Sequence, residues 1–168
     1  LHDDDLSRTT NGREIFPGRV KDTLDTFTFA ELQQLDAGAW FNAAFPDRAL
    51  GSFRGLRILR LEDLLDIAES GGHRSGIYIE TKAAYRFAGI ERQLVEALTR
   101  RGWISHAGSG AGAPVIFQSF EPDSLARFKE LAPQVPRLLL IDEVMIAKHG
   151  WDAVLKEAAQ VGMGIGTW

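Results

Sequence analysis

The fold is decided by residues 115–142, which read VIFQSFEPDSLARFKELAPQVPRLLLID. The apolar runs at 115–120 and 138–142 are short enough to be buried strands. Between them, Pro122 suits the first turn of a helix, where its missing N–H costs little. Apolar side chains then recur at the spacing of one helix face, at Leu125, Phe128 and Leu131. The stretch therefore predicts a strand, a helix and a second strand in that order.

The same alternation extends to both sides of this stretch. Further strands are expected at 76–81 and 164–168, and further helices at 29–35, 61–68, 90–101 and 152–161. Strands that alternate with helices predict a parallel sheet with covering helices, and nearly all-apolar strands indicate that both faces are buried. The fold class is therefore α/β. A (β/α)8 TIM barrel and an open doubly wound sheet both satisfy the pattern.

The barrel interpretation makes the chain part of a larger domain. A whole (β/α)8 barrel takes about 250 residues, whereas four strands in 168 residues are about half of the ring. We expect the N-terminal and C-terminal strands to be missing, because the chain starts at Leu1 rather than Met and its last strand stops at Trp168. Residues 1–168 are then one partial domain, in which 61–168 are the β/α units and 1–60 are a loop and an insertion before them.

The composition excludes several classes of function. The net charge is −4, without the clustered Lys and Arg of a nucleic-acid footprint. No apolar run reaches the roughly 18 residues that a membrane span needs. The chain has no Cys, so it forms no disulfide and no thiolate metal site. A hydrophobic fraction of 45% is too high for a disordered chain. The sequence is silent on the oligomeric state.

The first segment suited to catalysis is residues 1–12, which read LHDDDLSRTTNG. Short polar side chains of this kind favour loops, because they bond nearby backbone. The segment places His2 beside Asp3. A histidine exchanges a proton near neutral pH, and an adjacent carboxylate can orient its ring.

The second such segment is the end of the predicted strand 76–81. Glu80 and Lys82 are two residues apart there, so we expect them to project to the same side. The carboxyl end of a parallel strand is where barrels and open α/β sheets place their active sites. A carboxylate can bind a hard divalent cation, and a lysine can hold a phosphate as a point charge. A plain Glu–Lys surface pair satisfies the same spacing, so spacing alone leaves both interpretations open.

Several segments, in order along the chain, resemble the glycerophosphodiester phosphodiesterase family. The opening block resembles its His-Asp loop, and YIETK at 78–82 resembles its strand that ends in Glu-x-Lys. IFQSF at 116–120 resembles the following strand, which ends in Ser-Phe. Residues 21–40 resemble the segment after the His-Asp loop, and residues 59–65 resemble a helix start. The chain is thus similar to the central part of this family over most of its length.

The resemblance implies metal-dependent hydrolysis of a small-molecule glycerophosphodiester to glycerol 3-phosphate and an alcohol. It implies His2 as one of two acid/base histidines, Glu80 as a ligand of a divalent cation (Ca²⁺ or Mg²⁺) and Lys82 as a phosphate contact. It also implies that Ser119 and Phe120 bind substrate at the mouth of the pocket. Family members carry the other histidine and two further carboxylate ligands in an earlier segment, so we expect the chain alone to be inactive.

Two alternatives and one question of location stay open. A phospholipase D-like or phosphoinositide-cleaving barrel shares this chemistry, and Trp40, Phe41 and Phe45 fit the apolar rim that a lipid tail needs. These aromatic residues fit the packing of the insertion equally well. The second alternative is a non-catalytic module that keeps the phosphate pocket. Residues 13–60 resemble the longer type of insertion, which favours a periplasmic or secreted protein.

Other features predict structure rather than chemistry. The acidic run Asp3–Asp5 lacks the spacing of an EF-hand, so we expect a solvated turn. The glycine-rich segment 108–112 lacks the Lys-Ser/Thr ending of a phosphate-binding loop. No two of the remaining histidines have the i, i+4 spacing of metal ligands, and we expect them at the surface: His73, His106 and His149.

Overall fold

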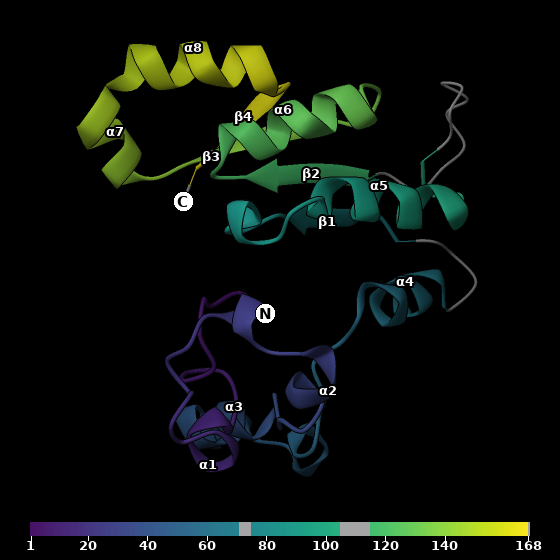
Figure 1. Cartoon of the computed structure of the whole chain (residues 1–168), viewed down its shortest axis with the longest axis vertical. Coiled ribbons are helices and arrows are strands. Elements are labelled where there is room, and N and C mark those ends of the chain that lie inside the picture. Colours follow the sequence, from purple (N-terminus) through teal and green to yellow (C-terminus); the bar gives the residue numbers. More distant parts are fainter. Residues whose placement is uncertain (71–74, 105–114, 168) are drawn as a thin grey trace. The chain divides into compact units, whose positions relative to one another are not determined.

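The computed structural model describes residues 1–70, 75–104 and 115–167. They form two compact units, Leu1–Leu64 and Leu65–Trp168 (Figure 1). The predictions for His73, His106 and the segment 108–112 lie outside the described residues.

Four parallel strands form one sheet in the second unit, in the order β1-β2-β3-β4. Their bounds are β1 Ile77–Glu80, β2 Val115–Ser119, β3 Arg137–Ile141 and β4 Gly164–Thr167. Strands that neighbour one another in space also follow one another in the chain, as in successive β/α units (Figure 1). The predicted α/β class with a parallel sheet is confirmed. Within the described residues the sheet is not closed, with β1 and β4 at its edges.

Three helices form a layer on one face of this sheet. They are α5 Ile90–Arg100, α6 Pro122–Leu131 and α8 Trp151–Val161. The central helix α6 contacts β2, β3 and both neighbouring helices. Phe117 of β2 stacks on Phe128 of α6 with the ring centroids 4.0 Å apart, and both side chains are fully buried. The apolar stripe expected on α6 is therefore the centre of the core.

The opposite face of the sheet is less buried than the sequence predicts. Along β2 and β3, buried residues alternate with half-buried ones, because the described helices cover only the face of Phe117. A Cβ atom at Gly166 of β4 would lie 3.6 Å from the hydroxyl oxygen of Tyr78 in β1. Adjacent strands are about 4.8 Å apart, so the two edges of a flat four-stranded sheet would be about 14 Å apart. The sheet therefore curls around this face, which is consistent with a TIM barrel.

The third strand ends one residue earlier than predicted because Asp142 has another role. The sequence predicts Asp142 within the third strand, but β3 ends at Ile141 and Asp142 caps α7 (Glu143–His149), a helix that was not predicted. Its side chain accepts a hydrogen bond from the N–H of Met145 at 2.8 Å. This contact satisfies one of the N–H groups that the first turn of a helix leaves unpaired.

Two further helical segments remain: one crosses the boundary between the two units in the sequence, and the other belongs to the second unit. Helix α4 is Leu61–Glu69 and agrees with the predicted helix at 61–68, while the short 3-10 helix η4 is Ala84–Arg86. Among the described residues, no helix is both long enough and apolar enough to cross a membrane.

The first unit consists of short helical segments around a small apolar core. Their bounds are α1 Gly12–Ile15, η1 Leu24–Thr26, α2 Phe29–Leu32, α3 Ala39–Ala44, η2 Pro46–Arg48 and η3 Gly51–Phe53. The buried core residues are Leu6, Val20, Phe27 and Leu35. Phe16 packs its ring on Phe27, with the centroids 5.6 Å apart.

The start of α2 follows from local sequence. Thr28 accepts a hydrogen bond from the N–H of Glu31 at 3.2 Å, and the Glu31 carboxylate accepts one from the N–H of Thr28 at 2.8 Å. This reciprocal pair is a capping box, which satisfies two N–H groups at the helix start. The helix ends at Leu32, earlier than predicted, and Leu35 beyond its end is fully buried in the core.

Candidate active site

Glu80 is the last residue of β1 and lies at the carboxyl end of the parallel sheet. Its oxygen Oε1 is buried and has no hydrogen-bond partner among the described residues. A buried acceptor of this kind is unfavourable unless a water donates a hydrogen bond to it or a cation coordinates it. The orphaned oxygen therefore suits a ligand of a hard cation, which prefers carboxylate oxygen.

Glu80 supplies only part of a cation site. Within residues 1–70, 75–104 and 115–167, no three His, Asp or Glu side chains are grouped so that they could hold a metal ion. Ca²⁺ and Mg²⁺ take six or more oxygen ligands in total. A cation at Glu80 would therefore take most of its ligands from water, substrate or other residues.

Tyr78 and Lys82 are two further polar groups of this strand and its end. Tyr78 stands two residues before Glu80, so both project to the same face of the sheet. Burial, and next the charge of Glu80, raise the pKa of Tyr78. Lys82 is exposed and follows the strand, which ends at Glu80 rather than at residue 81. Strand alternation therefore does not fix the direction of Lys82, contrary to the sequence argument.

Ser119 has a defined structural contact at the end of β2. It is fully buried, and its hydroxyl donates a hydrogen bond to the carbonyl oxygen of Thr81 at 2.8 Å. The hydroxyl oxygen of Ser119 also accepts a hydrogen bond from the N–H of Glu121 at 3.1 Å. Its contacts thus join the ends of β1 and β2, while contact with substrate stays a prediction. Phe120 is half-buried directly after β2, and its substrate contact also stays a prediction.

His2 belongs to the first unit, where a chain of charged contacts orients its ring. Its Nδ1 lies 3.1 Å from Oδ1 of Asp3, and Arg8 binds both carboxylate oxygens of Asp3 at 2.6 Å. The hydrogen bond from Arg8, and next the one from His2, hold the pKa of Asp3 well below its usual range. An ionised carboxylate only accepts hydrogen bonds, so Nδ1 carries the proton and Nε2 is the basic nitrogen.

Arg8 is a contributor to this loop that the sequence argument did not single out. Its side chain is 59% exposed, so the bidentate contact with Asp3 rather than burial places it. In the sequence, the only indication of this contact was an arginine five residues after an aspartate, because the turn between them has no periodicity. The loop is further fixed by Leu6, which is fully buried and donates its N–H to the carbonyl oxygen of Val20 at 3.2 Å.

Two of the three carboxylates in the acidic run at the start of this loop have partners. Asp5 accepts hydrogen bonds from the N–H of Ser7 at 2.8 Å and from the ammonium of Lys21 at 3.1 Å. Asp3 is held by Arg8 as described above. These contacts agree with the expected turn.

Asp5 predicts how the opening loop responds to acid. Hydrogen bonds from Ser7, and next from Lys21, lower the pKa of Asp5 to about 2. A carboxylate whose pKa is lower in the folded state contributes its full stabilisation at pH values above its ordinary pKa of about 3.9. This contribution is lost as the pH falls towards 2. We expect Asp5→Asn to reduce the free energy of unfolding near pH 6, and the reduction to vanish near pH 2. Urea denaturation across this range measures it, with exposed Asp4→Asn as control; a pH-independent difference contradicts the assignment.

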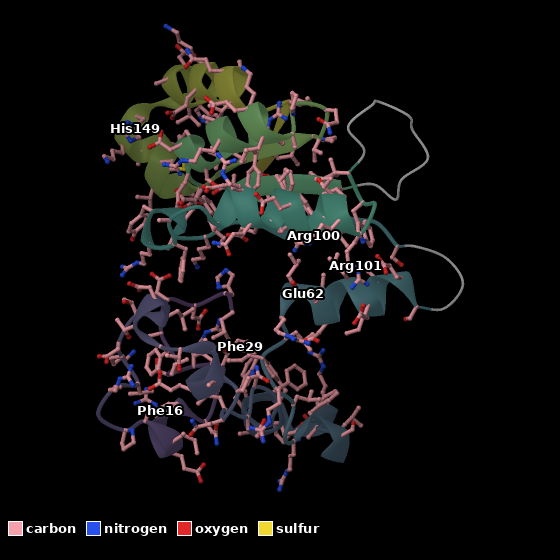
Figure 2. All side chains as sticks on the ribbon, turned by 45° about the vertical axis from the view of Figure 1, so that its right-hand side comes forward. Phe16, Phe29, Glu62, Arg100, Arg101 and His149 are labelled. Atoms are coloured by element: carbon pink, nitrogen blue, oxygen red, sulfur yellow. The ribbon has the colours of Figure 1, made fainter. Side chains whose placement is uncertain are left out.

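The predicted site residues thus fall into two groups. Glu80, Lys82, Ser119 and Phe120 lie at the carboxyl ends of β1 and β2 in the second unit. His2 lies in the first unit. His149 is the exposed last residue of α7, as expected of a surface histidine (Figure 2).

The sequence model of the glycerophosphoryl diester phosphodiesterase family matches residues 1–166. This chain belongs to the glycerophosphoryl diester phosphodiesterase family. The resemblance found in the sequence is thereby confirmed.

Known members of the family are similar over most of this chain. A glycerophosphodiester phosphodiesterase of Bacillus subtilis is 36% identical over 167 residues, which are 99% of this chain and 52% of that protein. A probable glycerophosphodiester phosphodiesterase 1 of Mycobacterium tuberculosis is 28% identical over 140 residues, which are 83% of this chain and 47% of that protein. The chain therefore spans about half the length of the curated relatives it matches.

A solved structure shows the same fold. A phosphodiesterase of Oleispira antarctica, solved in complex with the product sn-glycerol-3-phosphate, matches with a TM-score of 0.65 and 24% identity. The match covers 99% of this chain and 56% of that one.

Proposed function

We propose that the enzyme containing this sequence hydrolyses glycerophosphodiesters to glycerol 3-phosphate and an alcohol. The observation that carries the proposal is the buried, unpartnered Oε1 of Glu80 at a strand end in a chain of this family. A buried acceptor that no described residue satisfies suits a divalent cation, and an exposed lysine two positions later suits a phosphate. The names of the Bacillus subtilis and Mycobacterium tuberculosis relatives support the same activity.

Lys82 and Glu80 have complementary roles in this proposal. The ammonium of Lys82 holds a phosphate oxygen and stabilises the negative charge that develops on it during hydrolysis. The carboxylate of Glu80 would be one ligand of Ca²⁺ or Mg²⁺. When bound, such a cation would neutralise phosphate oxygens and polarise the phosphorus centre.

His2 is proposed to move a proton in the same reaction. Asp3 fixes the proton on Nδ1, which leaves Nε2 free to take a proton from the attacking hydroxyl or, once protonated, to give one to the leaving alcohol. Arg8 keeps the ionised Asp3 in position beside the ring of His2. The exposed ring of His2 is accessible to a substrate.

The assay that tests the proposal also tests Lys82. Release of glycerol 3-phosphate from glycerophosphocholine, glycerophosphoethanolamine and glycerophosphoglycerol is measured with and without a chelator. Lys82→Ala is expected to lower kcat/KM by about 10- to 100-fold, because a charge-assisted hydrogen bond to phosphate is lost. Lys156→Ala, at an exposed position on α8, is the control and retains full activity.

Three results would count against parts of the proposal. Failure of the intact enzyme to release glycerol 3-phosphate from any of these diesters, together with retained phosphate binding, points to a non-catalytic module. Full activity of Lys82→Ala removes that residue from the site. Full activity after exhaustive chelation removes the cation, whereas loss of activity that Ca²⁺ or Mg²⁺ restores supports it.

A further inference from the structure

The turn that follows Lys82 has an unusual backbone. Ala83 has φ of 50° and ψ of 39°, in the left-handed region, and it is the only residue other than glycine with positive φ among those described. Residues with a Cβ rarely adopt this conformation, and it persists only where surrounding contacts hold it. The turn therefore depends on contacts from outside itself.

The first such contact comes from Glu121, between β2 and α6. Its Oε2 accepts a hydrogen bond from the N–H of Ala84 at 2.8 Å. Glu121 occupies the N-cap position of α6, yet its side chain makes no capping hydrogen bond to that helix. The carboxylate is thus directed to the turn after Lys82 instead of to its own helix.

A second set of contacts holds the residue before Lys82. Thr81 is 3% exposed, its hydroxyl lies 2.9 Å from that of Ser124, and its carbonyl oxygen accepts the hydrogen bond from Ser119. The hydroxyl oxygen of Ser119 in turn accepts a hydrogen bond from the N–H of Glu121. The segment from Ser119 to Ser124 therefore fixes the backbone on both sides of Lys82.

Lys82 itself is held by none of these contacts. Its side chain is exposed, and no hydrogen bond or ion pair with another described residue fixes its ammonium. The aim of the side chain then depends on the backbone of the turn. We propose that Glu121 is a positioning residue that, through Ala84 and the left-handed Ala83, directs Lys82 towards the substrate phosphate.

This inference rests on the proposed function, because it gives Glu121 a role only if Lys82 binds phosphate. Glu121→Ala is expected to lower kcat/KM by about tenfold, since the hydrogen bond of a charged acceptor is lost. Glu121→Gln retains an acceptor oxygen for Ala84 and is expected to recover most of the activity. Glu130→Ala, at an exposed position on the same helix, is the matched control.

A double-mutant cycle separates positioning from general stabilisation. If Glu121 acts through Lys82, Glu121→Ala changes kcat/KM by less than about twofold in the Lys82→Ala background. Hydrogen exchange gives a readout that does not depend on activity. Peptides that contain Ala84 exchange faster in Glu121→Ala and at the original rate in Glu130→Ala and Glu121→Gln.

The outcomes distinguish the two levels of inference. Equal losses from Glu121→Ala in both backgrounds, or unchanged exchange at Ala84, overturn positioning by Glu121 while leaving the role of Lys82 intact. Full activity of Lys82→Ala overturns the phosphate role of Lys82 and the positioning role together. Coupled losses with faster exchange at Ala84 support the proposal.

Discussion

His2→Ala is expected to lower kcat by about 10²- to 10⁴-fold, the range that a positioned proton-transfer group contributes. The ring is removed from an exposed position, with its side chain 55% accessible, so no core contact is lost. Asp3 keeps its two hydrogen bonds from Arg8, and Leu6 stays buried in the core of the first unit. The loop is therefore expected to keep its conformation while the transferable proton disappears.

Steady-state kinetics with a glycerophosphodiester, alongside urea denaturation, measures this prediction. The free energy of unfolding is expected to change by less than about 0.5 kcal/mol, as for other surface substitutions. His149→Ala removes an exposed imidazole from the end of α7 and serves as control (Figure 2). Unchanged kcat in His2→Ala excludes the ring from proton transfer. A parallel collapse of stability means that the loss of activity is structural.

Glu80→Gln is expected to lower kcat/KM by about 100-fold or more, because a cation ligand contributes several kcal/mol of charge stabilisation. The substitution keeps the shape of the side chain and removes its charge. In wild-type protein, Ca²⁺ or Mg²⁺ should raise Tm, since a ligand that binds only the folded state stabilises it. The rise should shrink strongly in Glu80→Gln.

The Tm shift with cation is the decisive part of this second experiment, because it does not depend on turnover. Glu96→Gln removes a carboxylate from an exposed position on α5 and should leave the shift unchanged. Equal Tm shifts in wild type and Glu80→Gln would show that the cation binds elsewhere. Loss of activity without loss of the shift would assign Glu80 to another step.

Features that depend on neighbours in the chain were predictable from sequence. The capping box of Thr28 and Glu31 involves residues three positions apart, and the stripe on α6 follows from helical spacing. The position of Glu80 at a strand end follows from the apolar run before it. The cap by Asp142 was missed because an aspartate after an apolar run extends a strand pattern as readily as it starts a helix.

Features that join distant segments were not predictable. The contact between Glu121 and Ala84 spans 37 positions, and that between Ser119 and Thr81 spans 38. Both depend on the parallel register that places Glu80 beside Gln118. The reach of Tyr78 towards Gly166 depends on the curl of the whole sheet. None of these has a local signal, because the residues become neighbours only when the strands pair.

The sequence by itself determined the alternation of strands and helices, the polar His2 loop, and the place of Glu80 and Lys82 at the end of an apolar strand. Periodicity and local hydrogen bonding act over a few residues, so a local pattern records them. Only the tertiary structure decided that Oε1 of Glu80 is buried without a partner and that Ser119 joins two strand ends. It also decided that Glu121 holds the turn after Lys82. Burial and pairing of polar groups are set by what the fold packs against them, and no local pattern records that.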